Sequence, residues 1–241
     1  MATTTTLTPI ARGLEAYVAL PAGTGKHPGL VVMMEAFGIT GHIRGVCRRL
    51  AEAGFVAVAP DILHGDLIPY DDTPRAMAKI PTLKDAQVVD EMSACLDWLA
   101  AHPRVRPGAA GIIGFCMGGR YAFLANCRLA TRLHAAVAFY GGGIAPEVQG
   151  LDRYGRTPPI GEAEKMLAPL FLGYGADDSG IPPAEHARIA TALSSARKRY
   201  SLNVYPGAGH AFLCEERTNY APAAAEQGWR DVLDFLQAHL A

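Results

Sequence analysis

The sequence predicts an α/β fold with a mostly parallel central sheet and helices on both faces. The chain has 241 residues and is 50% hydrophobic, enough to bury one substantial core. Short apolar runs of strand length alternate with helix-periodic segments along the chain, and most of these runs are continuous, as in buried parallel strands. We expect a single domain over residues 1–241, with residues 1–12 forming a flexible N-terminal segment.

The first third of the chain begins the alternation of strands and helices. Residues 14–20 alternate weakly, which predicts an edge strand closed by Pro21. Residues 30–34 are a continuous apolar run and predict a buried strand. Helical spacing then follows until Gly54, and its apolar positions are Ile43, Val46, Cys47 and Leu50.

The remaining elements follow the same pattern. Residues 69–81 form a long polar connection, of a kind that often serves as a lid or binding segment, and residues 150–164 are expected to be a surface excursion. Further strands are predicted at 55–59, 109–113, 135–140, 170–174 and 202–205, and further helices at 89–99, after 116, after 182 and near the end of the chain.

Glu35 directly follows the buried strand at residues 30–34. In open parallel sheets, ligands bind at the carboxyl ends of the strands, so this carboxylate is a candidate site residue. The alternative is an exposed loop glutamate, because loops are where charges normally lie.

Cys116 lies at a sharp turn between a strand and a helix. Residues 111–120 read Gly-Ile-Ile-Gly-Phe-Cys-Met-Gly-Gly-Arg, an apolar strand end followed by small residues and a helical stretch. This is the nucleophile elbow pattern Gly-x-Ser-x-Gly with cysteine in place of serine. A dinucleotide loop would need Gly-x-Gly-x-x-Gly, which is absent. Cys116 could also be a small buried apolar residue.

Charge and cysteine content exclude several classes of protein. The 22 basic residues nearly balance the 23 acidic ones without a basic run, so we expect a small-molecule partner and neither nucleic acid nor membrane. The five cysteines lack Cys-x-x-Cys spacing, which suits reduced thiols and a cytoplasmic location. Asp61, His64 and Asp66 invite a metal interpretation, but no second histidine completes it, so no metal is predicted.

Three strand ends supply a cysteine, an acid and a histidine in that order along the chain. The acid is Asp177 or Asp178, and His210 follows the last predicted strand in a glycine-rich loop. This is the order of the catalytic triad in α/β-hydrolases. The acid would orient the imidazole, and the imidazole would take the thiol proton.

The chain resembles the dienelactone hydrolase family from about residue 30 to residue 236. The resemblance rests on the motifs at residues 35–38, 114–119, 178–182 and 209–212. It implies an α/β-hydrolase fold, cofactor-free hydrolysis of lactones and esters, and a triad of Cys116, His210 and Asp178. It further implies that Glu35 takes the thiol proton when substrate binds, and that the N–H groups of Ala36 and Met117 form the oxyanion hole.

The same resemblance suggests residues that bind the substrate. Family members hold the substrate carboxylate with arginines, and Arg75 lies in one of the corresponding loops. Cys214 occupies the position of the second arginine and Ala211 that of a serine, with Arg217 close enough to substitute. Phe37 and Tyr140 are the other predicted substrate contacts.

Two other kinds of function remain open from the sequence. One is a ligand-binding member of the same fold without turnover, and the other is a redox protein that uses the Cys116 thiol. The intact set of cysteine, histidine, aspartate and glutamate favours the enzyme. We expect a monomer or homodimer.

Overall fold

One eight-stranded sheet organises the computed structural model, which describes residues 3–147 and 151–240. The strands lie in the order β1-β2-β4-β3-β5-β6-β7-β8, and every neighbouring pair from β4 to β8 is parallel. The predicted α/β class is therefore confirmed. The strands are β1 (Thr4–Ala11), β2 (Leu14–Leu20), β3 (His27–Met33), β4 (Val56–Pro60), β5 (Val105–Phe115), β6 (Ala135–Phe139), β7 (Leu170–Gly175) and β8 (Tyr200–Tyr205).

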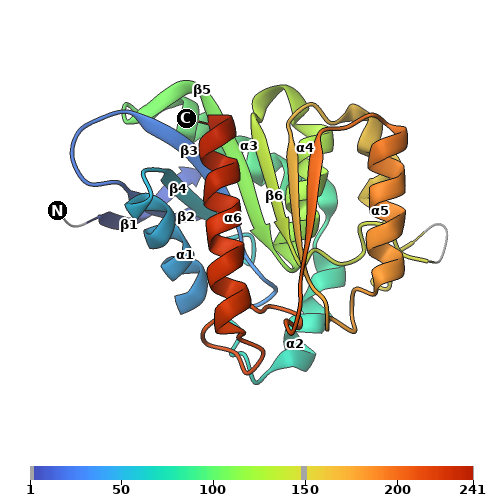
Figure 1. Ribbon diagram of the computed structural model, residues 1–241. Helices are drawn as coiled ribbons and strands as arrows, with labels where there is room; N and C mark the ends of the chain where they lie inside the picture. Colours follow the sequence, from blue (N-terminus) through green and yellow to red (C-terminus); the bar gives the residue numbers. More distant parts are fainter. Residues whose placement is uncertain (1–2, 148–150, 241) are drawn as a thin grey trace.

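Helices cover both faces of this sheet. In Figure 1, α1 and α6 lie in front of the strands and α3 and α4 lie behind them. Short 3-10 turns occupy Ile80–Thr82, Ala130–Arg132 and Pro159–Lys165. The helices are α1 (Gly41–Glu52), α2 (Thr73–Lys79), α3 (Asp85–Ala101), α4 (Met117–Arg128), α5 (Pro183–Ser195) and α6 (Pro222–Leu240).

The strand order reverses direction at β3. The chain runs from β3 outward to β4 and then returns to β5 on the other side, so the carboxyl ends of β3 and β5 border a crevice. Met33 pairs with Gly114, and Gly114 pairs with Ala138. Glu35 lies two residues after Met33, and Cys116 lies two residues after Gly114. The pairing of Met33 with Gly114 therefore brings Glu35 and Cys116 to the same edge of the sheet.

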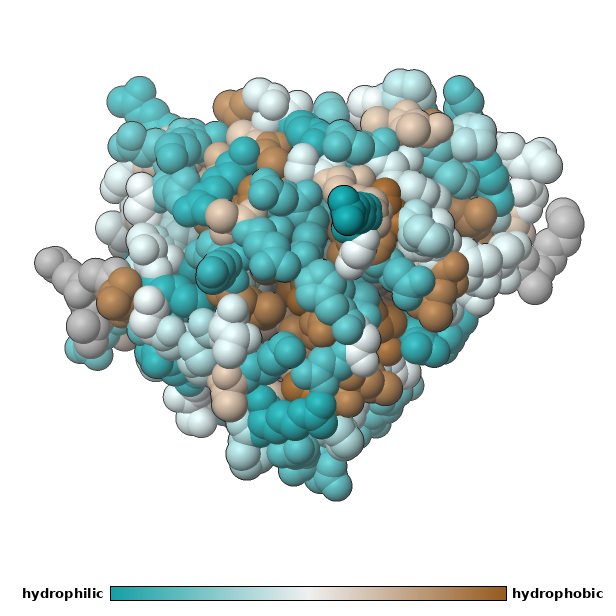
Figure 2. All heavy atoms as spheres, turned by 180° about the vertical axis from the view of Figure 1, so that it is seen from behind, coloured by the Kyte–Doolittle hydropathy of each residue, from teal (hydrophilic) through white to brown (hydrophobic). Residues whose placement is uncertain are grey.

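The outer surface of the helices is largely polar. Figure 2 shows the rear face, where hydrophilic residues predominate and apolar ones gather in smaller areas in its middle and lower part. Within the described residues, no helix is both long enough and apolar enough to cross a lipid bilayer.

The prediction of a flexible segment at residues 1–12 is wrong where the structure describes it. Thr4–Ala11 forms β1, which pairs antiparallel with β2 from Thr4 opposite Leu20 to Ala11 opposite Leu14. Threonine favours strands, and Gly13 has the positive φ of 77° that a tight hairpin turn needs. Consequently β2 is the second strand of the sheet, and the predicted edge position belongs to β1.

The long connection at residues 69–81 contains a helix that its polar composition concealed. The carboxylate of Asp72 caps α2 by accepting from the backbone N–H of Arg75 at 3.3 Å, and Pro74 stands in the first turn. In the predicted excursion at 150–164, Gly150 lies outside the described residues, and the part from residue 151 consists of turns leading into Pro159–Lys165.

Candidate active site

Cys116 stands between β5 and α4 in a strained backbone conformation. Its φ is 55° and its ψ is −117°, a region that side chains other than glycine rarely adopt. Its backbone N–H donates to the carbonyl of Phe139 at 3.0 Å, which fixes the turn to the neighbouring strand. The turn exposes the side chain at the end of the sheet, as a nucleophile elbow requires.

Two glycines allow the helix to approach the strands this closely. A Cβ atom on Gly114 would lie 2.0 Å from the carbonyl oxygen of Gly118, and one on Gly118 would lie 2.3 Å from that of Met33. Neither backbone carbonyl can move away without shifting an element. The N-terminus of α4, with its free N–H groups, therefore sits directly beneath Cys116.

His210 connects the thiol to a carboxylate. Its Nε2 lies 3.1 Å from Sγ of Cys116, and its Nδ1 lies 2.7 Å from Oδ2 of Asp178. The other oxygen of Asp178 accepts from the N–H of Gly180 at 2.9 Å. Asp178 is 4% exposed whereas Asp177 is exposed, so the structure selects Asp178 from the two candidates as the partner of the histidine.

Charged neighbours on both ring nitrogens favour the imidazolium form of His210. Burial disfavours the charged ring, but the negative charge of Cys116 and the hydrogen bond that Nδ1–H donates to Asp178 outweigh it and raise the pKa of His210 to about 10. This pKa lies above the ordinary value of 6.5, so the ring holds its second proton to a higher pH than a free histidine does. Positive charge beside a cysteine activates it as a nucleophile.

This pairing predicts a titration that depends on the thiol. NMR of the His210 ring should give a pKa close to 10 in the native chain, and Cys116→Ala should lower it because the anionic neighbour is removed. A ring that titrates near its ordinary value in the native chain would contradict the ion pair.

Glu35 is fully buried beside this triad. Its Oε2 accepts from the hydroxyl of Tyr70 at 3.3 Å, and Oε1 lies 3.8 Å from a guanidinium nitrogen of Arg217. Tyr70 also contacts the Thr40 hydroxyl at 2.9 Å and the Cys214 thiol at 3.4 Å. Sequence reasoning did not single out Tyr70, because its role depends on how residue 70 folds back over residue 35.

The thiol does not rest on Glu35. Among the side chains that the structure describes, the hydrogen-bond partner of Sγ is His210 and not Glu35, the residue that the resemblance implies takes the thiol proton. Burial raises the pKa of Glu35, although Arg217 and His210 oppose this shift. A carboxyl with a raised pKa is suited to accept and hold a proton near neutral pH.

Ala36 and Met117 supply the candidate oxyanion hole. Ala36 is 1% exposed in the turn after β3, and Met117 is the first residue of α4. Within residues 3–147 and 151–240, neither backbone N–H donates to a protein acceptor. Both amides are therefore free to bind a developing oxyanion.

A pocket of about 270 Å³ opens over Cys116 and His210. Phe37 forms part of its wall, and the guanidinium of Arg217 lies 5.2 Å from the centre of the Phe37 ring. The remaining lining side chains come from α2 and the 3-10 turn that follows it, from the start of α4, from the segment after residue 150 and from the loop after β7. They are Thr73, Met77, Ile80, Met117, Arg153, Tyr154, Arg156, Asp178 and Ser179.

Arg75, which the resemblance suggests as a substrate contact, is not among the residues that line this pocket. It lies on α2 and forms a salt bridge with Asp66 at the surface. Arg153, Arg156 and Arg217 line the pocket instead. No acidic side chain in the described part of the chain pairs with Arg153, whereas Arg156 pairs with Asp152 at 2.9 Å. Arg153 and Arg156 escaped prediction because their segment has no periodic pattern.

Tyr140 lies behind the triad rather than in the pocket. Its side chain is fully buried, and its ring meets the His210 ring edge-on with 5.4 Å between centroids. Tyr140 has a positive φ of 38°, which turns the chain sharply at the end of β6. The residue predicted to contact substrate therefore contacts the ring of His210 instead.

A buried arginine on α4 holds the arginine-bearing wall of the pocket. Arg120 is fully buried, donates to both oxygens of Asp85 at 2.9 and 2.8 Å, and donates to the carbonyl of Thr157 at 2.8 Å. Its Nε lies 3.7 Å from Asp152, which also holds Arg156. The elbow helix thus fixes the segment that carries Arg153.

Comparison with known proteins places the chain in a family. The sequence profile of the dienelactone hydrolase family matches residues 14–240. The chain belongs to the dienelactone hydrolase family. This family member is 33% identical over 230 residues to the "Putative carboxymethylenebutenolidase" of Synechocystis sp., covering 93% of this chain and 91% of the relative. It is 34% identical over 226 residues to the "Probable 2-oxo-3-(5-oxofuran-2-ylidene)propanoate lactonase" of Bradyrhizobium sp., covering 93% and 89%.

A solved structure supports the same assignment for this dienelactone hydrolase family member. The crystal structure described as "Putative Dienelactone Hydrolase" from Klebsiella pneumoniae superposes with a TM-score of 0.88 at 32% identity, covering 98% of this chain and 99% of the other. The α/β-hydrolase fold expected from the resemblance is confirmed.

Proposed function

We propose that this dienelactone hydrolase-like protein hydrolyses small lactones or carboxylic esters through a thioester on Cys116. The observation that carries the proposal is the continuous contact from Cys116 through His210 to Asp178, at 3.1 and 2.7 Å, at the floor of a pocket. The family membership and the lactonase name of a relative support the same chemistry.

The first half of the reaction forms the acyl-enzyme. The Cys116 sulfur attacks the carbonyl carbon, and the N–H groups of Ala36 and Met117 bind the oxyanion. The carbon–oxygen bond of the ester then breaks, and the imidazolium of His210 gives its Nε2 proton to the departing alkoxide. Ring opening of a lactone leaves the alcohol attached to the acyl group, whereas an ester releases it.

The second half returns the enzyme to its starting state. Neutral His210 takes a proton from water as the water oxygen attacks the thioester. The carbon–sulfur bond then breaks, which releases the carboxylic acid and leaves the Cys116 thiolate beside the imidazolium of His210. Asp178 holds Nδ1–H throughout and so keeps Nε2 directed at the reacting groups. Glu35 takes the thiol proton in arrangements where Cys116 turns away from His210.

The direct test is lactone or ester opening by the purified chain in excess EDTA without added cofactor. Acid release from cis- and trans-dienelactone at constant pH, and p-nitrophenol release from p-nitrophenyl acetate, should both saturate with substrate. Failure of every lactone and ester to turn over would refute the hydrolase and leave the ligand-binding alternative.

The cationic wall predicts a preference for substrates that carry a carboxylate. Arg153→Met should raise KM for a carboxylate-bearing ester by about 10- to 100-fold, because one charge-assisted hydrogen bond contributes about 1.5–3 kcal/mol. A neutral ester of the same size should be affected little. The reason is that Arg153 lines the pocket without an acidic partner in the part of the chain described.

Arg75→Met is the matched control for this prediction. Arg75 lies on α2 and pairs with Asp66 outside the pocket, so KM for both esters should stay at the native value. Equal increases of KM for charged and neutral esters in Arg153→Met would show that the arginine supports the fold and does not bind the substrate carboxylate.

A further inference from the structure

Three metal-ligating side chains converge in the interior beside the proposed catalytic site. Glu35, His42 and Cys214 each offer one ligand atom, and these atoms all lie within 4.8 Å of one another. Glu35 and Cys214 are fully buried, and His42 is 9% exposed. Across the described ranges, this is the one group of three or more such side chains that converges in this way.

Two of the three side chains have a buried polar atom without a hydrogen bond. Within the described residues, Oε1 of Glu35 and Nε2 of His42 have no hydrogen-bond partner. An unsatisfied buried polar atom costs about 1–3 kcal/mol, so the fold carries a cost that a ligand at this point would remove.

The donor set suits one class of ion. A thiolate, an imidazole and a carboxylate are the ligands of borderline-soft divalent ions, of which Zn²⁺ is the common example. Zinc bond lengths of about 2.0–2.3 Å in a tetrahedron separate neighbouring ligand atoms by about 3.3–3.6 Å. Atoms already within 4.8 Å of one another would each need to move by about 1 Å or less.

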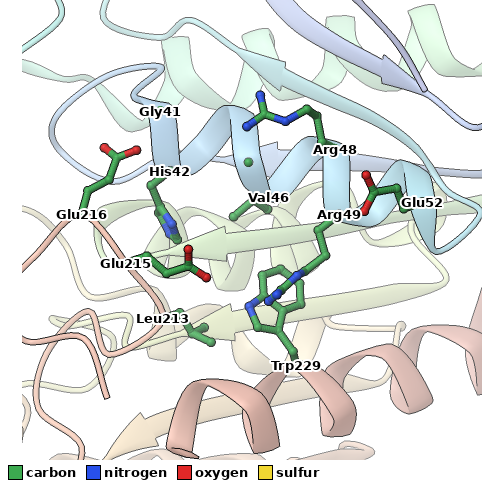
Figure 3. Close-up of a pocket in the computed structure, with 11 residues that line it drawn as sticks. Gly41, His42, Val46, Arg48, Arg49, Glu52, Leu213, Glu215, Glu216 and Trp229 are labelled. Carbon is green, nitrogen blue, oxygen red and sulfur yellow. The ribbon is translucent and has the colours of Figure 1, made fainter. Parts of the chain in front are cut away.

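A second pocket reaches one member of this cluster, His42, from outside. It measures about 320 Å³ and is lined by residues of α1, by residues around position 215 and by Trp229 of α6. Figure 3 shows the imidazole of His42 projecting from the start of α1, with Glu215 and Glu216 beside it. Arg48, Arg49 and Glu52 line the same pocket, so side chains of both charges border it.

Cys214 lies on the inner side of the same segment. Its neighbours Leu213 and Glu215 line the pocket, whereas its thiol contacts the hydroxyl of Tyr70 at 3.4 Å. His42 lines the pocket and also reaches Glu35 and Cys214, so it joins the outer pocket to the buried cluster.

We propose that this chain binds Zn²⁺ between Glu35, His42 and Cys214, reached through the pocket beside α1, and that the bound ion inhibits hydrolysis by taking the Glu35 carboxylate. Binding forms bonds from the metal to one oxygen, one nitrogen and one sulfur, and the thiol proton of Cys214 passes to solvent. No electron is transferred. The binding stands independently of the proposed function, whereas the inhibition rests on it.

The binding is tested with Co²⁺ as a spectroscopic probe in the Cys116→Ala chain. This background is needed because Cys116 and His210 form another sulfur and nitrogen pair. We expect a near-ultraviolet thiolate-to-cobalt charge-transfer band that Zn²⁺ displaces and that Cys214→Ser abolishes. Cys127→Ser is the matched control, since that thiol points to the carbonyl of Pro159 on another part of the fold.

Removal of the competing guanidinium gives a second signature. Arg217 lies 3.8 Å from Oε1 of Glu35 and competes with a metal for this oxygen, so Arg217→Met should tighten Co²⁺ binding. Absence of the band in the Cys116→Ala chain, or its survival in Cys214→Ser, would overturn the site. Weaker binding in His42→Gln is also expected, and folding of each variant is checked by circular dichroism.

Inhibition is measured on the chain with Cys116 intact. Zn²⁺ should slow ester hydrolysis reversibly with EDTA, and Cys214→Ser should be at least tenfold less sensitive when each chain is compared with its own zinc-free rate. Equal sensitivity would place the inhibitory zinc at Cys116 and His210 and refute the inhibition. If no chain hydrolyses any ester, the proposed function fails while the cobalt band still decides the metal site.

Discussion

Replacing Cys116 with alanine should lower kcat/KM for esters and lactones by about 10⁴-fold or more, the scale seen when a catalytic nucleophile is removed. The reason is that every covalent step of the proposed reaction passes through Sγ. This atom stands at the strained turn, 3.1 Å from Nε2 of His210. Initial rates with p-nitrophenyl acetate measure the loss.

Cys127→Ala controls for removal of a thiol from the same helix. Cys127 lies on α4, is 3% exposed and contacts the carbonyl of Pro159 at 3.9 Å. Its replacement should leave kcat unchanged. Retention of more than about 1% of native kcat/KM in Cys116→Ala would contradict the nucleophile assignment.

Replacing Arg120 with methionine should destabilise the fold by about 3–5 kcal/mol, the cost typical of breaking a buried ion pair from one side. Arg120 is fully buried and holds Asp85 through two hydrogen bonds. It also binds the carbonyl of Thr157, so its loss should release the segment that carries Arg153. Urea denaturation measures the first effect, and KM for a carboxylate-bearing ester measures the second.

Arg128→Met, on the same helix, is the control that removes an arginine from a partly exposed ion pair rather than from a buried one. Arg128 pairs with Glu162 at 2.6 Å, but its side chain is 33% exposed, and such a pair contributes about 1 kcal/mol or less. A similar loss of stability in both variants would show that the Arg120 network contributes no more than a surface salt bridge.

The order of strand ends was the most informative property of the sequence. Continuous apolar runs locate parallel strands, and residues just after such runs fall at one edge of the sheet. The strand ends therefore group Cys116, His210 and either Asp177 or Asp178, and the structure brings Cys116, His210 and Asp178 together.

The pocket wall was not predictable from the same patterns. The place of Arg75 in a loop suggested a contact with substrate, but a salt bridge to Asp66 holds it at the surface. Such a pairing between side chains leaves no periodic pattern in the sequence. Arg153 faces the pocket because Arg120 anchors its segment from another part of the chain. Tyr140 looked like a residue at a strand end, yet the turn after β6 buries it.

Strand β1 and the cluster of Glu35, His42 and Cys214 were likewise not predictable from sequence patterns, because both depend on contacts between distant parts of the chain. A polar run of threonines resembles a flexible segment until β2 provides a partner for its backbone. His42 directly precedes the apolar positions of a predicted amphipathic helix. The sequence marks Cys214 only as the residue that stands where family members have an arginine. Their proximity to Glu35 arises from packing between α1 and the segment before α6.

The measurement that tests the central claim most directly is capture of the acyl-enzyme. The chain is mixed rapidly with p-nitrophenyl acetate, p-nitrophenol release is followed, and acid-quenched samples are analysed by intact and peptide mass spectrometry. We predict a burst stoichiometric with enzyme and an acetyl group on the peptide that contains Cys116, both absent from Cys116→Ala. A burst and adduct that persist in the variant, or an acetyl group on another residue of the turning-over enzyme, would contradict the thioester route.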